Sequence, residues 1–136
     1  MPERAYLDAN VLLRLLLYDE PGQAEAVAAL LRESERSRPE LRLASVTLAE
    51  IVFVLGGAVY RLERAAVAGV IEVILGLPIT IEERDVAERA LAIYRDDHPN
   101  WADAYLAACA LLRANGRLVT FDRELKRLPE LTAVSF

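Results

Sequence analysis

Short apolar runs alternate with longer segments of helical periodicity, and this alternation constrains the fold more than any other feature of the chain. Strand-like runs of four to six residues lie at 4–9, 41–44, 78–81, 118–121 and 132–135. Between them, the periodicity predicts helices over 11–18, 21–37, 47–60, 63–75, 84–95, 101–115 and 122–128. Strands that alternate with helices are typical of right-handed βαβ units in a parallel sheet. We therefore predict an α/β domain with a short central parallel sheet of about five strands, flanked by helices on both faces.

Length, charge and cysteine content exclude several classes of protein. The 136 residues fit one compact domain, and 16 Lys and Arg against 21 Asp and Glu give a net charge of −5. An acidic balance argues against a protein that holds nucleic acid by bulk positive charge. Cys109 has no second cysteine for an internal disulfide, and the longest uncharged run, 51–60, is about half a bilayer span. We expect a cytoplasmic protein without a membrane segment.

Polar residues follow the predicted strands at the ends where parallel sheets collect their functional groups. They come in pairs along the chain: Asp8 with Asn10, Thr47 with Glu50, Asn100 with Asp103, and Thr120 with Asp122. Asn100 and Asp103 open the helix before the fourth strand, and the other pairs follow strands one, two and four. We expect all four acids to meet at one edge of the sheet.

Helix capping offers a structural explanation for each acid alone. Thr47 and Glu50 have capping-box spacing, Asn100 precedes an acid in a first turn, Asp122 is a candidate N-cap, and Asp8 is a candidate Asx turn. Capping alone would scatter such acids over both edges of the sheet. At roughly 5 Å and an effective dielectric constant of about 20, each carboxylate pair would repel by around 3 kcal/mol. The joint placement therefore favours a site that binds a cation.

The ligand type indicates which cation and which chemistry. Oxygen ligands without His or Cys select hard divalent ions, Mg²⁺ or Mn²⁺, over Zn²⁺. Such ions lower the pKa of a bound water and stabilise the attacking and leaving oxygens of a phosphodiester. The residues themselves therefore predict metal-dependent phosphodiester hydrolysis.

Four short motifs in this order carry a resemblance to a known family. They are the runs YLDANVLL at 6–13, TLAE at 47–50, WADAYLAA at 101–108 and TFD at 120–122. Together they resemble a PIN domain, specifically the VapC-like toxins of type II toxin–antitoxin pairs, over nearly the whole chain. The resemblance implies a single PIN domain over 1–136, with Mg²⁺- or Mn²⁺-dependent endoribonuclease activity. It also implies a homodimer that a cognate antitoxin protein holds inactive.

The resemblance also implies a role for each site residue. Asp8, Glu50 and Asp103 would be the central metal-binding acids, and Asp122 a further acid that supports a metal or its water. Asn10, Thr47 and Thr120 would orient these carboxylates by hydrogen bonds. Many relatives carry an acid where this chain has Asn100, which lowers the local negative charge and puts a second metal site in doubt.

Three side chains near the predicted site are candidates for contact with RNA. Arg14 lies one helical turn after Asn10, Arg123 is next to Asp122, and Trp101 begins the third motif. For both arginines the alternative is a solvated charge or a surface ion pair, and for Trp101 it is packing against a helix. His98 is interpreted as a loop residue, because the chain has no second His with which to form a metal or acid–base pair.

An apolar surface for a second copy or an antitoxin is the remaining sequence candidate. It comprises the stretch 51–60 together with Val67, Val70, Ile71 and Ile74, and ordinary core is the equally weighted alternative.

Two other enzyme classes and one non-enzymatic class compete with the nuclease. A phosphoacceptor receiver domain needs a Lys at the end of its last strand, whereas the only Lys, Lys126, lies in a predicted short helix. A phosphatase with an Asp-x-Asp pair fails because residue 10 is Asn. A catalytically inactive PIN-like binding or scaffold module stays open, and the retention of all four acids speaks against it.

Overall fold

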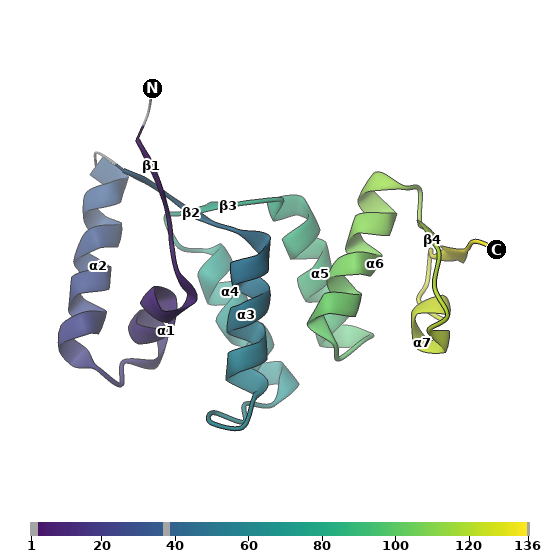
Figure 1. Ribbon diagram of the computed structural model, residues 1–136, viewed down its shortest axis with the longest axis horizontal. Coiled ribbons are helices and arrows are strands. Elements are labelled where there is room, and N and C mark those ends of the chain that lie inside the picture. The colour runs from purple at the N-terminus through teal and green to yellow at the C-terminus, as the bar shows by residue number, and fades with distance from the viewer. Residues whose placement is uncertain (1–2, 37–38, 136) are drawn as a thin grey trace.

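The chain forms helices and short strands in the predicted order. The computed structural model describes residues 3–36 and 39–135 (Figure 1). Its elements are β1 (Arg4–Tyr6), α1 (Ala9–Leu17), α2 (Pro21–Arg36), β2 (Glu40–Leu43), α3 (Ser45–Gly56), α4 (Arg64–Leu75), β3 (Thr80–Ile81), α5 (Arg84–Asp96), α6 (Trp101–Arg113), β4 (Arg117–Leu118), α7 (Arg123–Lys126) and β5 (Thr132–Ala133). None of the helices in these ranges has both the length and the apolar content needed to cross a bilayer.

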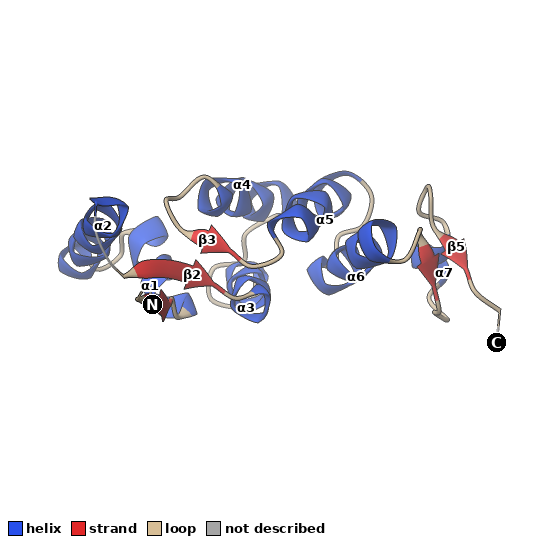
Figure 2. Cartoon of the chain, turned by 90° about the horizontal axis from the view of Figure 1, so that it is seen from above, coloured by secondary structure: helices blue, strands red, loops and turns tan. Residues whose placement is uncertain are grey.

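The strands form two parallel sheets, so the prediction of one sheet of about five strands is wrong. β1, β2 and β3 make a three-stranded sheet in that order, with Tyr6 opposite Arg42 and Leu43 opposite Ile81. β4 pairs with β5 in a separate sheet. Figures 1 and 2 show β4, β5 and α7 at one end of an elongated molecule, beyond α6, and the three-stranded sheet among α1 to α4.

The C-terminal sheet has its own contacts with α5 and α6. Leu118, Leu125 and Leu128 are buried in the core cluster, β4 contacts α6, and Arg89 of α5 forms an ion pair with Glu130 at 2.6 Å. The Gly116 N–H donates to the Ala110 carbonyl at 2.8 Å, at the end of α6. Hydrophobic periodicity predicts that such strands exist, but it does not specify which strand each one pairs with.

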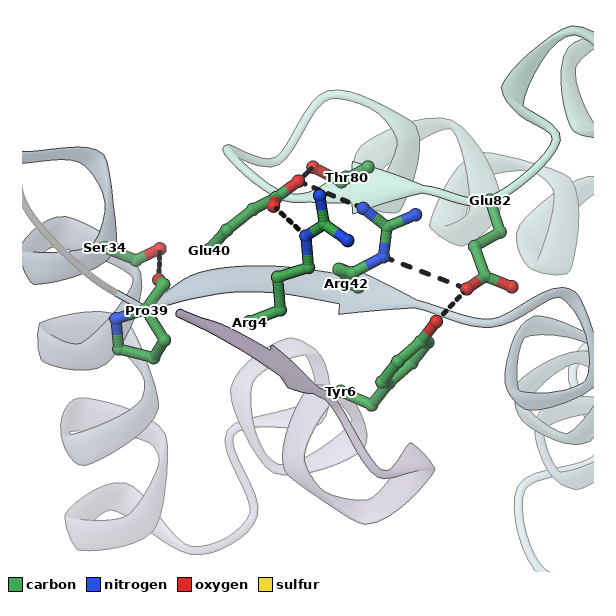
Figure 3. A network of polar contacts seen from close by, with 8 residues as sticks. All are labelled: Arg4, Tyr6, Ser34, Pro39, Glu40, Arg42, Thr80 and Glu82. Carbon is green, nitrogen blue, oxygen red and sulfur yellow. Dashed lines mark hydrogen bonds and ion pairs between the residues drawn. The ribbon is translucent and has the colours of Figure 1, made fainter. Parts of the chain in front are cut away.

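The three-stranded sheet is apolar on one face only. Leu7, Leu41, Leu43 and Ile81 are buried in the core. The opposite face carries a polar network across all three strands (Figure 3), made by Arg4, Tyr6, Glu40, Arg42, Thr80 and Glu82. β1 is shorter than the predicted run 4–9, since it ends at Tyr6, and both of its ends are exposed. Charged side chains at alternate positions prevent apolar burial of this face.

Helix ends agree with the predictions within a few residues at most positions. The predicted capping box at Thr47 and Glu50 is wrong, because α3 begins at Ser45 after Ala44 and places Thr47 inside its first turn. The same helix ends at Gly56, before the predicted Tyr60. The predicted end of the second helix, Ser37, lies outside the described residues.

Gly116, which follows α6, has a left-handed conformation with φ of +78°. A Cβ atom at this position would lie 2.4 Å from the Glu130 carbonyl oxygen. The turn between α6 and β4 therefore requires glycine for conformation and for space.

Part of the predicted apolar surface is core. Val67, Ile71 and Ile74 of α4 are buried within the chain, as are Ile51, Val52 and Leu55 of α3. Phe53 and Val59 have exposed fractions of 80% and 83%, and Gly56 and Ala58 between them are also exposed. This exposed part of the predicted surface is accessible to a partner.

Candidate metal centre

Two of the predicted acids lie together with a histidine. Asp103 is in the first turn of α6, Asp122 caps α7, and His98 lies in the loop between α5 and α6. Each of the three offers one ligand atom, and these atoms lie within 4.8 Å of one another. Residues from two distant parts of the chain thus meet beside the second sheet.

Local hydrogen bonds fix the backbone beneath both carboxylates. Asn100 Oδ1 accepts a hydrogen bond from the Asp103 N–H at 3.0 Å, and Thr120 Oγ1 accepts one from the Asp122 N–H at 3.0 Å. Asp122 Oδ1 in turn accepts from the N–H groups of Glu124 and Leu125 at 2.8 and 3.3 Å. The N-cap predicted at Asp122 and the acid predicted in the first turn at Asp103 are confirmed, and Asn100 is the N-cap of α6. Capping and clustering occur together here, so one does not exclude the other.

His98 is the residue of this cluster that sequence reasoning missed. Its exposed fraction is 5%, and its Nδ1 accepts a hydrogen bond from the Asn100 N–H at 3.2 Å. Its Nε2 is buried without a hydrogen-bond partner, 3.6 Å from Asp103 Oδ2 and 3.9 Å from Glu124 Oε2. The available signal was its position two residues before the N-cap Asn100, which places a buried loop side chain under the start of α6.

The donor set fits a hard divalent cation. Two carboxylates with oxygens within 4.8 Å repel by about 3 kcal/mol at an effective dielectric constant of about 20. The Asp103 side chain is 32% exposed, so solvent only partly screens this repulsion. Carboxylate oxygens are the ligands that Mg²⁺ and Mn²⁺ prefer. Asp103 and Asp122 would hold the ion, and His98 Nε2 lies 3.6 Å from Asp103 Oδ2.

Asp8 and Glu50 are placed elsewhere. Asp8 follows β1 and caps α1, where its Oδ1 accepts a hydrogen bond from the Ala9 N–H at 2.8 Å. Glu50 is exposed on α3. Within residues 3–36 and 39–135, the group of His, Cys and acidic residues that could hold a metal contains neither of them. Asp8 follows β1 of the first sheet and Glu50 lies on α3, whereas Asp122 follows β4 of the second sheet.

The polar neighbours predicted around these two acids lie with them. Asn10 is exposed in the first turn of α1, and Thr47 is half-buried in the first turn of α3. Neither lies within the group formed by His98, Asp103 and Asp122.

The three candidates for RNA contact differ in exposure. Arg14 forms an ion pair with Asp19 at 3.3 Å and lines a groove with Asn10 between α1 and α2. Arg123 is exposed directly after Asp122. Trp101 is 5% exposed and packs edge-on against Tyr94, with ring centroids 5.8 Å apart. Packing, the alternative weighed for Trp101, is what the structure shows.

Comparison with known proteins identifies the family. The profile of the PIN domain family matches residues 5–131. The chain belongs to the PIN domain family. No curated protein and no solved structure matches the chain. PIN domains are generally nucleases that use a divalent metal, and the Asp103–Asp122 pair is an acidic group of the kind such a domain needs.

Proposed function

We propose that this PIN domain is a Mg²⁺- or Mn²⁺-dependent endoribonuclease, the toxin of a toxin–antitoxin pair. The observation that carries the proposal is the meeting of Asp103 and Asp122 around the buried Nε2 of His98 in a member of this family. The four motifs of the sequence support the finer assignment to VapC-like toxins.

Each acid has a place in the proposed site. Asp103 and Asp122 would hold the ion, while Asn100 and Thr120 fix their backbone. Asp8 and Glu50, both exposed, would complete the acidic site from the side of the first sheet. A divalent ion held there would lower the pKa of a bound water and offset negative charge on the phosphate. Contributions from α1 and α3 on one side and from α6 and α7 on the other would make cleavage depend on both parts of the molecule.

Surface charge and exposure support a substrate and a partner. A net charge of −5 leaves RNA binding to a few cations, and the candidates are Arg123, exposed directly after Asp122, and Arg14, in the groove between α1 and α2. An antitoxin or a second copy would cover Phe53 and Val59, which lie in the exposed part of the predicted apolar surface. An arginine of the antitoxin would suit the acidic site as an inhibitor, because a guanidinium binds carboxylates in a forked geometry.

Cleavage of total RNA with added Mn²⁺ tests the proposal. We expect cleavage that EDTA abolishes and that Asp8→Asn and Asp103→Asn reduce by orders of magnitude. Glu20→Gln is the matched control, since this exposed acid lies outside the cluster and should keep the parental rate. A single-stranded DNA of the same sequence as the mapped RNA site tests the preference for RNA.

Retention of activity in the folded Asp103→Asn protein would contradict the metal site. If the parent protein binds Mn²⁺ without cleaving RNA, the binding-module alternative replaces the nuclease. The toxin assignment requires that the product of the neighbouring reading frame binds the protein and stops cleavage.

A further inference from the structure

His98 has one ring nitrogen with a partner and one without. The Asn100 N–H donates to Nδ1 at 3.2 Å, so the lone pair of Nδ1 is already in use. Neutral imidazole carries one hydrogen, and it must therefore reside on Nε2. The Nε2–H group is buried away from solvent, and no described atom accepts its hydrogen bond. A buried donor without an acceptor is costly, so a nearby group should pair with it.

The groups that face Nε2 are carboxylates. Asp103 Oδ2 lies 3.6 Å away and Glu124 Oε2 lies 3.9 Å away, both just beyond hydrogen-bond distance. Asp122 completes the cluster. The Asp103 side chain is 32% exposed and that of Glu124 is 69% exposed. Asp103 is the closer and more buried acceptor, and a shift of under about 1 Å would complete its hydrogen bond with His98.

The same geometry argues against His98 as a direct metal ligand. A histidine that binds a metal through Nε2 needs its hydrogen on Nδ1, where it normally donates to a carbonyl or a carboxylate. Here Nδ1 faces a backbone N–H, which cannot accept that hydrogen. Direct ligation through Nε2 would thus place a hydrogen on Nδ1 against the Asn100 N–H, and the hydrogen bond between these two groups would be lost.

We propose that His98 is a positioning residue, whose Nε2–H donates to Asp103 Oδ2 and holds this carboxylate toward Asp122 for a divalent cation. The proposal rests on the metal site of the proposed function and adds a residue to it. Hydrogen bonds to ligating carboxylates fix their orientation, and loss of such a partner lowers metal affinity by about 10- to 100-fold. Because the ligands remain oxygens, His98 would preserve the preference for Mg²⁺ and Mn²⁺.

Two amide substitutions at His98 test the role of the Nε2–H donor separately from that of the rest of the side chain. His98→Gln can place an N–H near the position of Nε2, whereas His98→Asn is too short to reach Asp103. The Asn oxygen can accept a hydrogen bond from the Asn100 N–H in place of Nδ1, whereas Gln replaces the donor at Nε2 only. In calorimetric titration with Mn²⁺, we expect about 10- to 100-fold weaker binding for His98→Asn and near-parental binding for His98→Gln. Glu124→Gln, a change at the exposed neighbour, should alter the affinity little.

Each result of the titration decides one question. No Mn²⁺ binding by the folded parent protein would refute the metal site and with it the role of His98. Parental binding followed by equal affinity in His98→Asn would refute the role of His98 alone. Thermal unfolding without metal checks that the variants fold, and His98→Leu, which also lacks the donor, replaces His98→Asn if that variant does not fold.

Pulsed electron paramagnetic resonance of bound Mn²⁺ gives a readout independent of affinity. A positioning role predicts a spectrum without the coupling of a directly coordinated imidazole nitrogen. Observation of that coupling in the parent protein, together with its loss in His98→Gln, would make His98 a ligand and overturn the proposal.

Discussion

Trp101 is the first residue of α6, and its ring is buried between Tyr94 and Tyr105. We expect Trp101→Ala to lower the free energy of unfolding by about 3–5 kcal/mol, as large-to-small changes of buried aromatic residues do. Urea unfolding measures the change. Trp101→Phe, which keeps an aromatic ring, should cost less. An unchanged stability in Trp101→Ala with weakened RNA binding would contradict this role and favour base stacking.

Gly116 is a second residue whose substitution has a defined effect. Its φ is +78°, and an added Cβ atom would lie only 2.4 Å from the Glu130 carbonyl oxygen. Gly116→Ala should therefore destabilise the protein by more than about 1 kcal/mol. Gly22→Ala is the matched control, because nothing lies within 4 Å of its Cβ position at the start of α2. Thermal unfolding of both variants compares them, and equal midpoints would refute the requirement for glycine.

At the residue scale, the sequence predicts features that depend only on neighbouring residues, such as helix caps. The caps at Asn100 and Asp122 require only neighbouring backbone N–H groups, and both are present. His98 was out of reach of such reasoning, since one histidine makes no pattern. Its burial depends on the loop after α5, where the His98 N–H donates to the Ile93 carbonyl at 2.8 Å. The sequence shows that His98 lies two residues before the N-cap Asn100, but it does not show the turn after α5 or the burial of the side chain.

At the scale of the elements, Glu40 connects the strands of the first sheet. Its carboxylate accepts a hydrogen bond from Thr80 Oγ1 at 2.6 Å and pairs with Arg42 at 3.1 Å (Figure 3). The Thr80 hydrogen bond, then the charges of Arg42 and Arg4, hold the pKa of Glu40 below its ordinary value of 4.5. A lowered folded-state pKa stabilises the protein above the unfolded-state pKa, and this stabilisation is lost as the pH falls through the folded-state pKa.

Thr80→Val should therefore make unfolding less sensitive to acid. Without the hydroxyl, the pKa of Glu40 in the folded state moves back toward its value in the unfolded chain. The free energy of unfolding should then fall less steeply with decreasing pH below about 4.5 than in the parent protein. Urea unfolding at a series of pH values measures both slopes, and identical slopes would show that this hydrogen bond does not act on stability.

Element identity was predictable, and strand pairing was not. Every predicted helix and strand has a counterpart, because periodicity and the Pro and Gly residues between segments determine local structure. Pairing depends instead on contacts between residues far apart in the sequence, such as those that bury Leu118, Leu125 and Leu128 in the core. The prediction that all four acids share one edge assumed a single sheet. Asp103 and Asp122 lie within one group, which does not include Asp8 or Glu50.

At the scale of the whole molecule, a bound ion should stabilise the fold. A ligand that binds only the folded state adds about 2.7 kcal/mol when its concentration is 100 times its Kd. We expect Mn²⁺ to raise the thermal midpoint by several degrees, EDTA to reverse the shift, and Asp103→Asn to abolish it. Glu20→Gln should shift like the parent. An equal shift in Asp103→Asn would place the ion at another site.

The separate C-terminal sheet has a consequence for how the protein opens. β4 and β5 have two residues each, and α7 has four, so the segment 116–134 has few backbone hydrogen bonds to lose. Such small units open locally at a lower free energy than the core. Amide hydrogen exchange should therefore be faster in this segment than in the core helix α3. Because each opening carries Asp122 away from Asp103, Mn²⁺ should slow exchange here most, and the frequency of these local openings would set the lifetime of the metal site.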